Sequence, residues 1–141
     1  MILKKTADVK DEEILSYDGF IVGGPVHWSN LSPEVKRFVD QVGTVLSRNS
    51  KTIGEGKTAG AFCTGGGVSM GKEVTRVSIL SAFLTMRMVA IGGVDVRGFG
   101  TLGADATTGE DDPGVSEKEL TEGRLFGERF VRLTRRLRER K

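Results

Sequence analysis

Two short loops carry the residues best suited to hold a ligand, and each follows an apolar run directly. The first contains the only tryptophan and the only histidine of the chain, and its residues are Pro25, Val26, His27, Trp28, Ser29 and Asn30. The second consists of Thr64, Gly65, Gly66 and Gly67. Glycine leaves backbone N–H groups unobstructed, and an aromatic side chain can bound a flat ring. Together the loops predict a site for a flat ligand with polar atoms along its edge.

His27 and Cys63 are the side chains that could react themselves. An imidazole changes charge near neutral pH, as a general base must, but the sequence favours a ring contact or a solvated loop position for His27. Cys63 is the only cysteine and has no partner for disulfide chemistry, so we predict a buried small residue. One histidine and one cysteine cannot supply the usual zinc ligand sets. The sequence therefore indicates neither a catalytic side chain nor a metal site.

The composition narrows the class of protein. A chain of 141 residues is long enough for one domain with a buried core. The net charge of +2 gives no basic field for nucleic acid, and no apolar run approaches the roughly 20 residues of a membrane span. The single cysteine, and the lack of a signal-peptide pattern after Met1, favour the cytoplasm.

The first loop is positioned by a strand and a helix. Residues 20–22 predict a buried strand, which ends where glycines and a proline at 23–25 break the extended run. A helix follows over residues 32–48, with Ser32 as its cap and Pro33 at its first position.

The second loop lies between a strand of small residues over 58–63 and a helix over 72–86. In that helix the apolar residues on one side are Val74, Val77, Leu80 and Leu84. Residues 88–91 predict a third strand, and residues 1–5 look like the end of another. This alternation of strands and helices predicts an α/β fold with a parallel sheet.

The C-terminal part combines a long loop with a helix. Residues 94–113 show no period, which predicts either a lid and subunit contact or a mobile surface loop. Ser116 and Glu119 have the spacing of a capping box at the start of the last helix. The arginines at the end of that helix complement its dipole, a simpler interpretation than binding of a phosphate or nucleic acid.

Three segments, in order, resemble the flavodoxin-like family of NAD(P)H:quinone oxidoreductases and FMN reductases. Residues 17–33, Tyr-Asp-Gly-Phe-Ile-Val-Gly-Gly-Pro-Val-His-Trp-Ser-Asn-Leu-Ser-Pro, resemble the third strand of that family and its loop. Residues 56–67 resemble the next strand and flavin loop, and residues 88–93 are similar to a Gly-Met-Val-Val-Val-Gly motif. The similarity covers nearly the whole chain, although Ser29 stands where the family usually has glycine.

The resemblance implies a three-layer α/β sandwich of the flavodoxin type in which residues 25–30 and 64–67 hold the ring of FMN. Trp28 would bound the ring, and the backbone N–H groups of both loops would meet its polar edge. The implied electron donor is NAD(P)H and the implied acceptor is a quinone or a similar flat molecule. The family commonly forms dimers or tetramers, so a homo-oligomer is also implied.

The resemblance also implies that the single domain over residues 1–141 is incomplete at its N-terminus. The family begins with a strand, a Ser/Thr-rich loop for the FMN phosphate and a helix, whereas residues 1–5 resemble the end of the second strand. The strand over residues 20–22 would then be an exposed edge. Three arrangements would relieve this: a start upstream of Met1, another chain over the edge, or direct pairing of residues 1–5 with that strand.

Three functions follow from these observations. The first is an FMN-dependent oxidoreductase in which donor and acceptor use one pocket in turn. The second is a flavodoxin-type electron carrier, although such carriers are usually strongly acidic and this chain has a net charge of +2. The third is a flavodoxin-like module that does not retain FMN and serves in oligomerisation or interaction.

Overall fold

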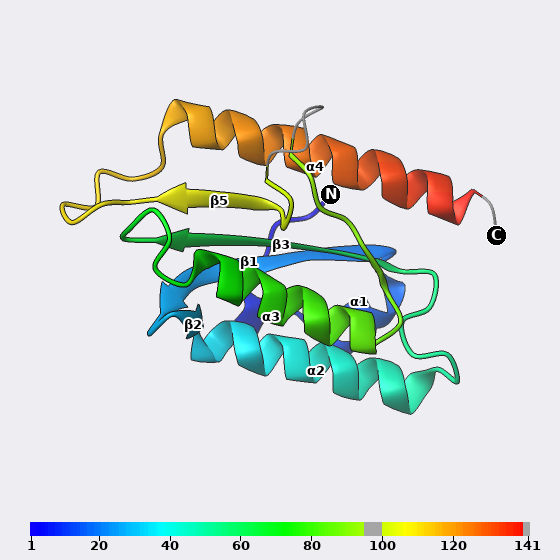
Figure 1. Ribbon diagram of the computed structural model, residues 1–141. Helices are drawn as coiled ribbons and strands as arrows, with labels where there is room; N and C mark the ends of the chain where they lie inside the picture. Colours follow the sequence, from blue (N-terminus) through cyan, green and yellow to red (C-terminus); the bar gives the residue numbers. More distant parts are fainter. Residues whose placement is uncertain (95–99, 140–141) are drawn as a thin grey trace.

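The computed structural model describes residues 1–94 and 100–139, which form a sheet between two layers of helices (Figure 1). In chain order the elements are η1 (Thr6–Asp8), α1 (Asp11–Ser16), β1 (Gly19–His27), β2 (Asn30–Leu31), α2 (Pro33–Asn49), β3 (Thr58–Gly65), α3 (Lys72–Thr85), β4 (Val89–Ala90), β5 (Ala104–Thr107) and α4 (Glu117–Arg138). One face of the sheet is covered by α4, and the other by α2 and α3. The predicted α/β class is confirmed.

The central strand of the sheet is β3. On one side it pairs in parallel with β1, from Gly19 opposite Thr58 to Pro25 opposite Thr64. On the other side β4 pairs with the beginning of β3 and β5 with its end, both in parallel. Because parallel strands end at the same edge, the segments that follow β1, β3 and β5 meet at one carboxyl edge of the sheet.

The helices on the two faces enclose separate apolar clusters. The larger cluster lies between the sheet and α2 with α3, and includes Phe20, Val42 and Phe83. The smaller cluster lies under α4 and contains Phe126 and Phe130. Both predicted helix starts are confirmed: the Ser32 hydroxyl accepts the N–H of Val35 at 3.4 Å, and Ser116 and Glu119 form the capping box.

The first strand is longer than the sequence predicts. Its glycines and proline at 23–25 do not break the strand, and β1 continues to His27. A Cβ atom on Gly23 would lie 2.0 Å from the carbonyl oxygen of Phe62, so this glycine permits close contact with β3. Pro25 is exposed near the end of the strand, where its missing N–H does little harm.

Residues 94–113 contain a strand that the sequence did not reveal. Over its four residues β5 runs from Ala104, opposite Phe62, to Thr107, opposite Gly65. A strand this short shows no clear period, and the glycines around it are typical of a loop. Residues 95–99 of the predicted loop lie outside the described residues. The predicted third strand over 88–91 is present but reduced to β4.

Residues 1–5 are not a strand, so that prediction is wrong. They cross the edge of the sheet instead of running along it: Met1 lies near Gly127 of α4, and Lys4 Nζ lies 2.5 Å from Glu13 Oε1 of α1. Direct pairing of this segment with β1 is therefore contradicted. Within the described part of the chain, the outer edge of β1 pairs only with β2, at Val26 and His27.

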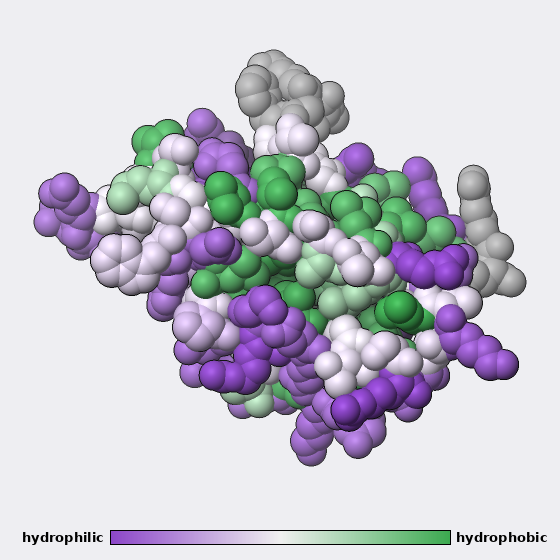
Figure 2. All heavy atoms as spheres, turned by 60° about the horizontal axis from the view of Figure 1, so that its bottom comes forward, coloured by the Kyte–Doolittle hydropathy of each residue, from purple (hydrophilic) through white to green (hydrophobic). Residues whose placement is uncertain are grey.

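The apolar side of α3 predicted from the sequence is largely its outer face. Val74, Val77 and Leu84 are 51%, 48% and 57% exposed, whereas Ile79 and Phe83 are fully buried. The pattern misled because the buried face also carries polar residues, namely Lys72, Thr75 and Arg76. In the view of Figure 2, apolar side chains gather at the surface between hydrophilic borders.

A tight hairpin joins β1 to β2. His27 pairs with Asn30, so Trp28 and Ser29 form a two-residue turn. Both have left-handed backbone, with φ of 46° and 60°, which is the type I′ geometry that normally selects asparagine and glycine. The turn is therefore strained by its own sequence.

We expect Ser29→Gly to raise the free energy of unfolding by about 1 kcal/mol, because glycine adopts positive φ without the Cβ clash. Urea unfolding would measure the change. Ser47→Gly, at an exposed position inside α2, is the matched control and should lower stability by about 0.5–1 kcal/mol. Destabilisation by both substitutions would contradict the strained turn.

Candidate functional site

The two loops singled out from the sequence lie side by side at the carboxyl edge. Pro25 is the register partner of Thr64, so the loops leave adjacent strands at the same level. A Cβ atom on Gly65 would lie 3.5 Å from Val26 Cγ2, which places the second loop against the first. The structure therefore brings residues 25–30 and 64–67 together.

Trp28 and His27 both face solvent. Trp28 has the exposure of a free side chain, 102%, so it is not part of the core. His27 is exposed as well, although it is the last residue of β1 and not a loop residue as predicted. An uncovered indole beside a glycine-rich loop is free to pack on a flat ring.

The second loop offers open backbone at its centre. Gly66 is exposed, and the nearest atom to a Cβ placed on it is the Gly109 carbonyl oxygen, 3.9 Å away. On one side the loop is anchored by the carbonyl oxygen of Gly65, which accepts the N–H of Thr108 at 2.9 Å. The loop is thus fixed at its base and unobstructed above Gly66, as a cradle for a ring requires.

Gly71 locks the two loops against each other. Its φ is +84°, and a Cβ atom there would lie 2.3 Å from the Cα of Ser29. Its carbonyl oxygen also accepts the N–H of Thr75 at the start of α3. Any side chain at this position would both strain the backbone and push the hairpin turn away.

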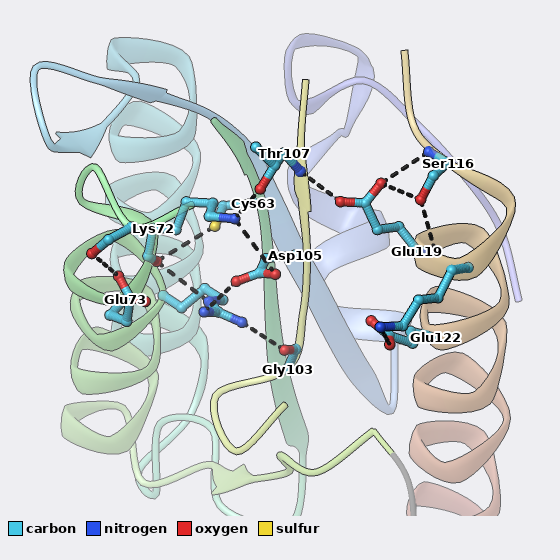
Figure 3. Close-up of polar contacts among 12 residues, drawn as sticks. Cys63, Lys72, Glu73, Gly103, Asp105, Thr107, Ser116, Glu119 and Glu122 are labelled. Carbon is cyan, nitrogen blue, oxygen red and sulfur yellow. Dashed lines mark hydrogen bonds and ion pairs between the residues drawn. The ribbon is translucent and has the colours of Figure 1, made fainter. Parts of the chain in front are cut away.

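A buried polar network lies beneath the second loop (Figure 3). The Lys72 ammonium donates to the Thr107 hydroxyl at 2.7 Å, and Arg76 forms an ion pair with Asp105 at 2.6 Å. A second nitrogen of Arg76 donates to the carbonyl oxygen of Gly103 at 2.7 Å. Both cationic side chains are at least 94% buried. The network ties the start of α3 to β5.

Glu119 extends the network to α4. One of its carboxylate oxygens accepts the backbone N–H of Thr107 at 2.7 Å, and the other accepts both the N–H and the hydroxyl of Ser116. The hydrogen bond from the Ser116 hydroxyl, followed by those from the Thr107 and Ser116 amides, lowers the pKa of Glu119. The capping box predicted from the sequence therefore also holds the end of β5.

Cys63 is buried, as predicted, with 1% of its surface exposed. Its thiol donates to the Lys72 carbonyl oxygen at 3.4 Å. Burial raises the pKa of the thiol to about 11, so it stays protonated near neutral pH and is a poor nucleophile.

Two hollows lie at the opposite end of the strands. One, of about 380 Å³, is lined by Thr58, Val89 to Gly92 and the C-terminal half of α4; the other, of about 430 Å³, lies among Leu15, Asp18, Asn49 and Lys57. Neither is lined by residues of the two loops. The candidate site is thus an open surface between loops and not one of these hollows.

The sequence missed the network under the loops. Lys72 and Arg76 are spaced i, i+4 at the start of a helix, and the sequence pattern assigned no role to either of them or to Asp105. No local signal marks the two cations as buried, because their partner Asp105 lies about thirty residues later in the chain.

Comparison with known proteins decides the family. The family described as NADPH-dependent FMN reductase matches residues 4–98, more than half of the chain. The chain belongs to the NADPH-dependent FMN reductase family. The resemblance noted in the sequence is thereby confirmed, and with it the prediction of an oxidoreductase family that works with FMN and NAD(P)H.

Curated relatives of this FMN reductase family member are named NAD(P)H dehydrogenase (quinone). The relative from Afipia carboxidovorans is 30% identical over 139 residues, covering 91% of this chain and 68% of its own length. The relative from Solidesulfovibrio magneticus is 28% identical over 138 residues, covering 90% of this chain and 66% of its own length. The chain thus spans about two thirds of the length of these relatives.

A solved structure shares the fold. The flavodoxin, WrbA-like protein from Agrobacterium tumefaciens superposes with a TM-score of 0.70 over 89% of this chain and 71% of its own, at 18% identity. The predicted flavodoxin-like sandwich is therefore confirmed. In the described residues no helix is long and apolar enough to cross a membrane, and no group of histidine, cysteine or acidic residues could hold a metal ion.

We expect Gly71→Ala to lower the free energy of unfolding by about 2 kcal/mol or more, because the new methyl group meets the Ser29 backbone at a strained φ. Gly66→Ala is the matched control: its methyl group enters open space, so stability should change by less than about 0.5 kcal/mol. Thermal or urea unfolding measures both. Equal effects would show that the loops are not locked at Gly71.

Proposed function

We propose that the two loops at the carboxyl edge hold the isoalloxazine ring of FMN, and that the chain passes electrons from NAD(P)H to a quinone or a similar flat acceptor. The observation that carries the proposal is the meeting of residues 25–30 and 64–67, with Ser29 packed on Gly71, in a member of this family. The names of the curated relatives support the quinone as acceptor.

The residues present fit the ring half of FMN. The open backbone at Gly66 gives a surface on which a ring can lie without meeting a side chain, and the exposed indole of Trp28 can bound it. Loop amides would donate to the carbonyl groups of the ring, and Gly71 keeps the two loops at a fixed separation. No residue is assigned to the phosphate.

Bound FMN would supply the hydride chemistry, because the flavin itself accepts two electrons from the nicotinamide and passes them on. The protein's part is then binding and orientation. The exposed loops leave one face open, so donor and acceptor would use it in turn. His27 is proposed as a contact at the rim, since its side chain is exposed at the end of β1.

The proposal predicts that the purified chain binds FMN and that NADPH bleaches its blue absorption band. Gly66→Ala should weaken FMN binding about tenfold or more, because the methyl group would occupy space reserved for the ring. Fluorescence titration of FMN measures the affinity. Gly123→Ala, a glycine of α4 with open space around it, is the control and should leave the affinity unchanged. A chain that binds no FMN would contradict the proposal and favour the interaction module.

A second copy of the chain is the proposed partner for the outer face of α3. Val74, Val77 and Leu84 are exposed on that helix, and β4 carries a further exposed apolar residue, Val89. A stripe of this kind is self-complementary, as a twofold interface requires, and monomers rarely expose large contiguous apolar patches.

A location in the cytoplasm is also proposed, because a single cysteine is typical of proteins in a reducing compartment.

We expect Val77→Glu to shift the chain from dimer or tetramer to monomer, since a carboxylate cannot be buried unpaired in an apolar contact. Sedimentation velocity measures the mass. Lys36→Glu, on the exposed surface of α2, is the control for an added negative charge and should leave the mass unchanged. A wild-type chain that sediments as a monomer at all concentrations would contradict the interface.

A further inference from the structure

Lys72 is a buried cation at the carboxyl edge of the sheet. Its side chain is 3% exposed, and its ammonium reaches the Thr107 hydroxyl at 2.7 Å. The nearest oxygen of Asp105 is 3.8 Å away, beyond hydrogen-bond distance. An ammonium buried with so little compensation is costly, so its retention calls for a reason other than stability.

One other buried cation, Arg76, and three carboxylates lie around Lys72. Asp105 is held more tightly by Arg76, at 2.6 Å, so one carboxylate faces two buried cations. Lys72 is also the first residue of α3, where the helix dipole adds positive potential. Two other carboxylates keep their negative charge nearby: Glu119 accepts from the Thr107 and Ser116 amides, and Glu73 is exposed and accepts from Ser69. The Lys72 ammonium is thus a positive charge within a mixed cluster, and among the described residues its hydrogen bond goes to the neutral Thr107 hydroxyl.

The Lys72 side chain lies beneath the second loop of the proposed ring site. A Cβ atom on Gly65 would lie 3.1 Å from Lys72 Cγ, so the methylene chain of Lys72 packs against the second loop. The same Cβ would lie 3.5 Å from Val26 Cγ2 of the first loop. Figure 3 shows the side chain reaching from α3 toward Thr107 on β5.

We propose that Lys72 is a positioning residue whose buried charge raises the reduction potential of the flavin held by the two loops. Hydride transfer from NAD(P)H adds two electrons and one proton to the ring, so the ring gains one negative charge. A fixed cation in a site of low dielectric stabilises that charge and favours the reduced form. The inference rests on the proposed function.

Lys72→Met tests the charge while keeping the methylene packing. We expect it to weaken binding of reduced FMN relative to oxidised FMN about tenfold, which for a two-electron couple lowers the midpoint potential by about 30 mV. Lys72→Arg should keep most of the wild-type potential. Lys51→Met removes a charge from an exposed turn at the other end of the strands and should change nothing. Dye-equilibrated reductive titration measures the potential.

Asp105→Asn distinguishes an effect of the lost charge on the flavin potential from an effect of the broken network. It removes the one carboxylate that faces both cations, so the potential should rise, opposite to Lys72→Met, although both substitutions break the same network. Potentials that move in the same direction, or that do not move in Lys72→Met, overturn the inference while leaving FMN binding intact. A wild-type chain that binds no FMN overturns the proposed function first and this inference with it.

Discussion

The parallel pairing of β1 with β3 is the constraint on which the rest of the structure depends. Because the two strands keep register from Gly19 and Thr58 to Pro25 and Thr64, their loops leave the sheet at the same level. A shift by one residue would turn the buried side chains of β1 to the wrong face and separate the loops. Close contact at Gly23 and the left-handed Gly71 are further consequences of that register, since each lets backbone approach backbone.

The polar network below the loops shows how the carboxyl edge is held together. Four elements contribute: β3 through Cys63, α3 through Lys72 and Arg76, β5 through Thr107, and α4 through Glu119. Each bond connects segments that the chain separates, so the edge behaves as one unit. A ligand bound between the loops would rest on this unit and not on flexible backbone.

The sequence predicted the parts of the fold that depend on local pattern. The cap at Ser32, the capping box at Ser116 and the buried strand at residues 58–63 follow from residue types at short spacing, and the structure has all three. The meeting of the two loops could be predicted because parallel strands end at one edge. The use of these loops for FMN stays a prediction.

Features that depend on tertiary packing escaped the sequence. The strand β5 is too short to show a period, and it exists because β3 offers it an edge. The buried face of α3 carries Lys72 and Arg76, whose partner Asp105 lies about thirty residues later in the chain, so nothing local marks those charges as buried. The spacing of Val74, Val77 and Leu84 in α3 predicted a buried face, but these residues are exposed.

β4 and β5 pair with different parts of β3 on the same side, and this arrangement limits where the chain can accept an insertion. Strand pairing with β3 ends at Ala90 of β4 and begins again at Ala104 of β5, on the same side of β3. Two short strands therefore take the place of one continuous strand. After Ala90, the N–H of Ile91 still donates to the carbonyl oxygen of Ala59 on β3 at 2.7 Å, and Ile91 and Val94 are buried in the cluster under α4. An insertion directly after Ala90 would therefore break a contact with β3 and disturb the apolar cluster under α4.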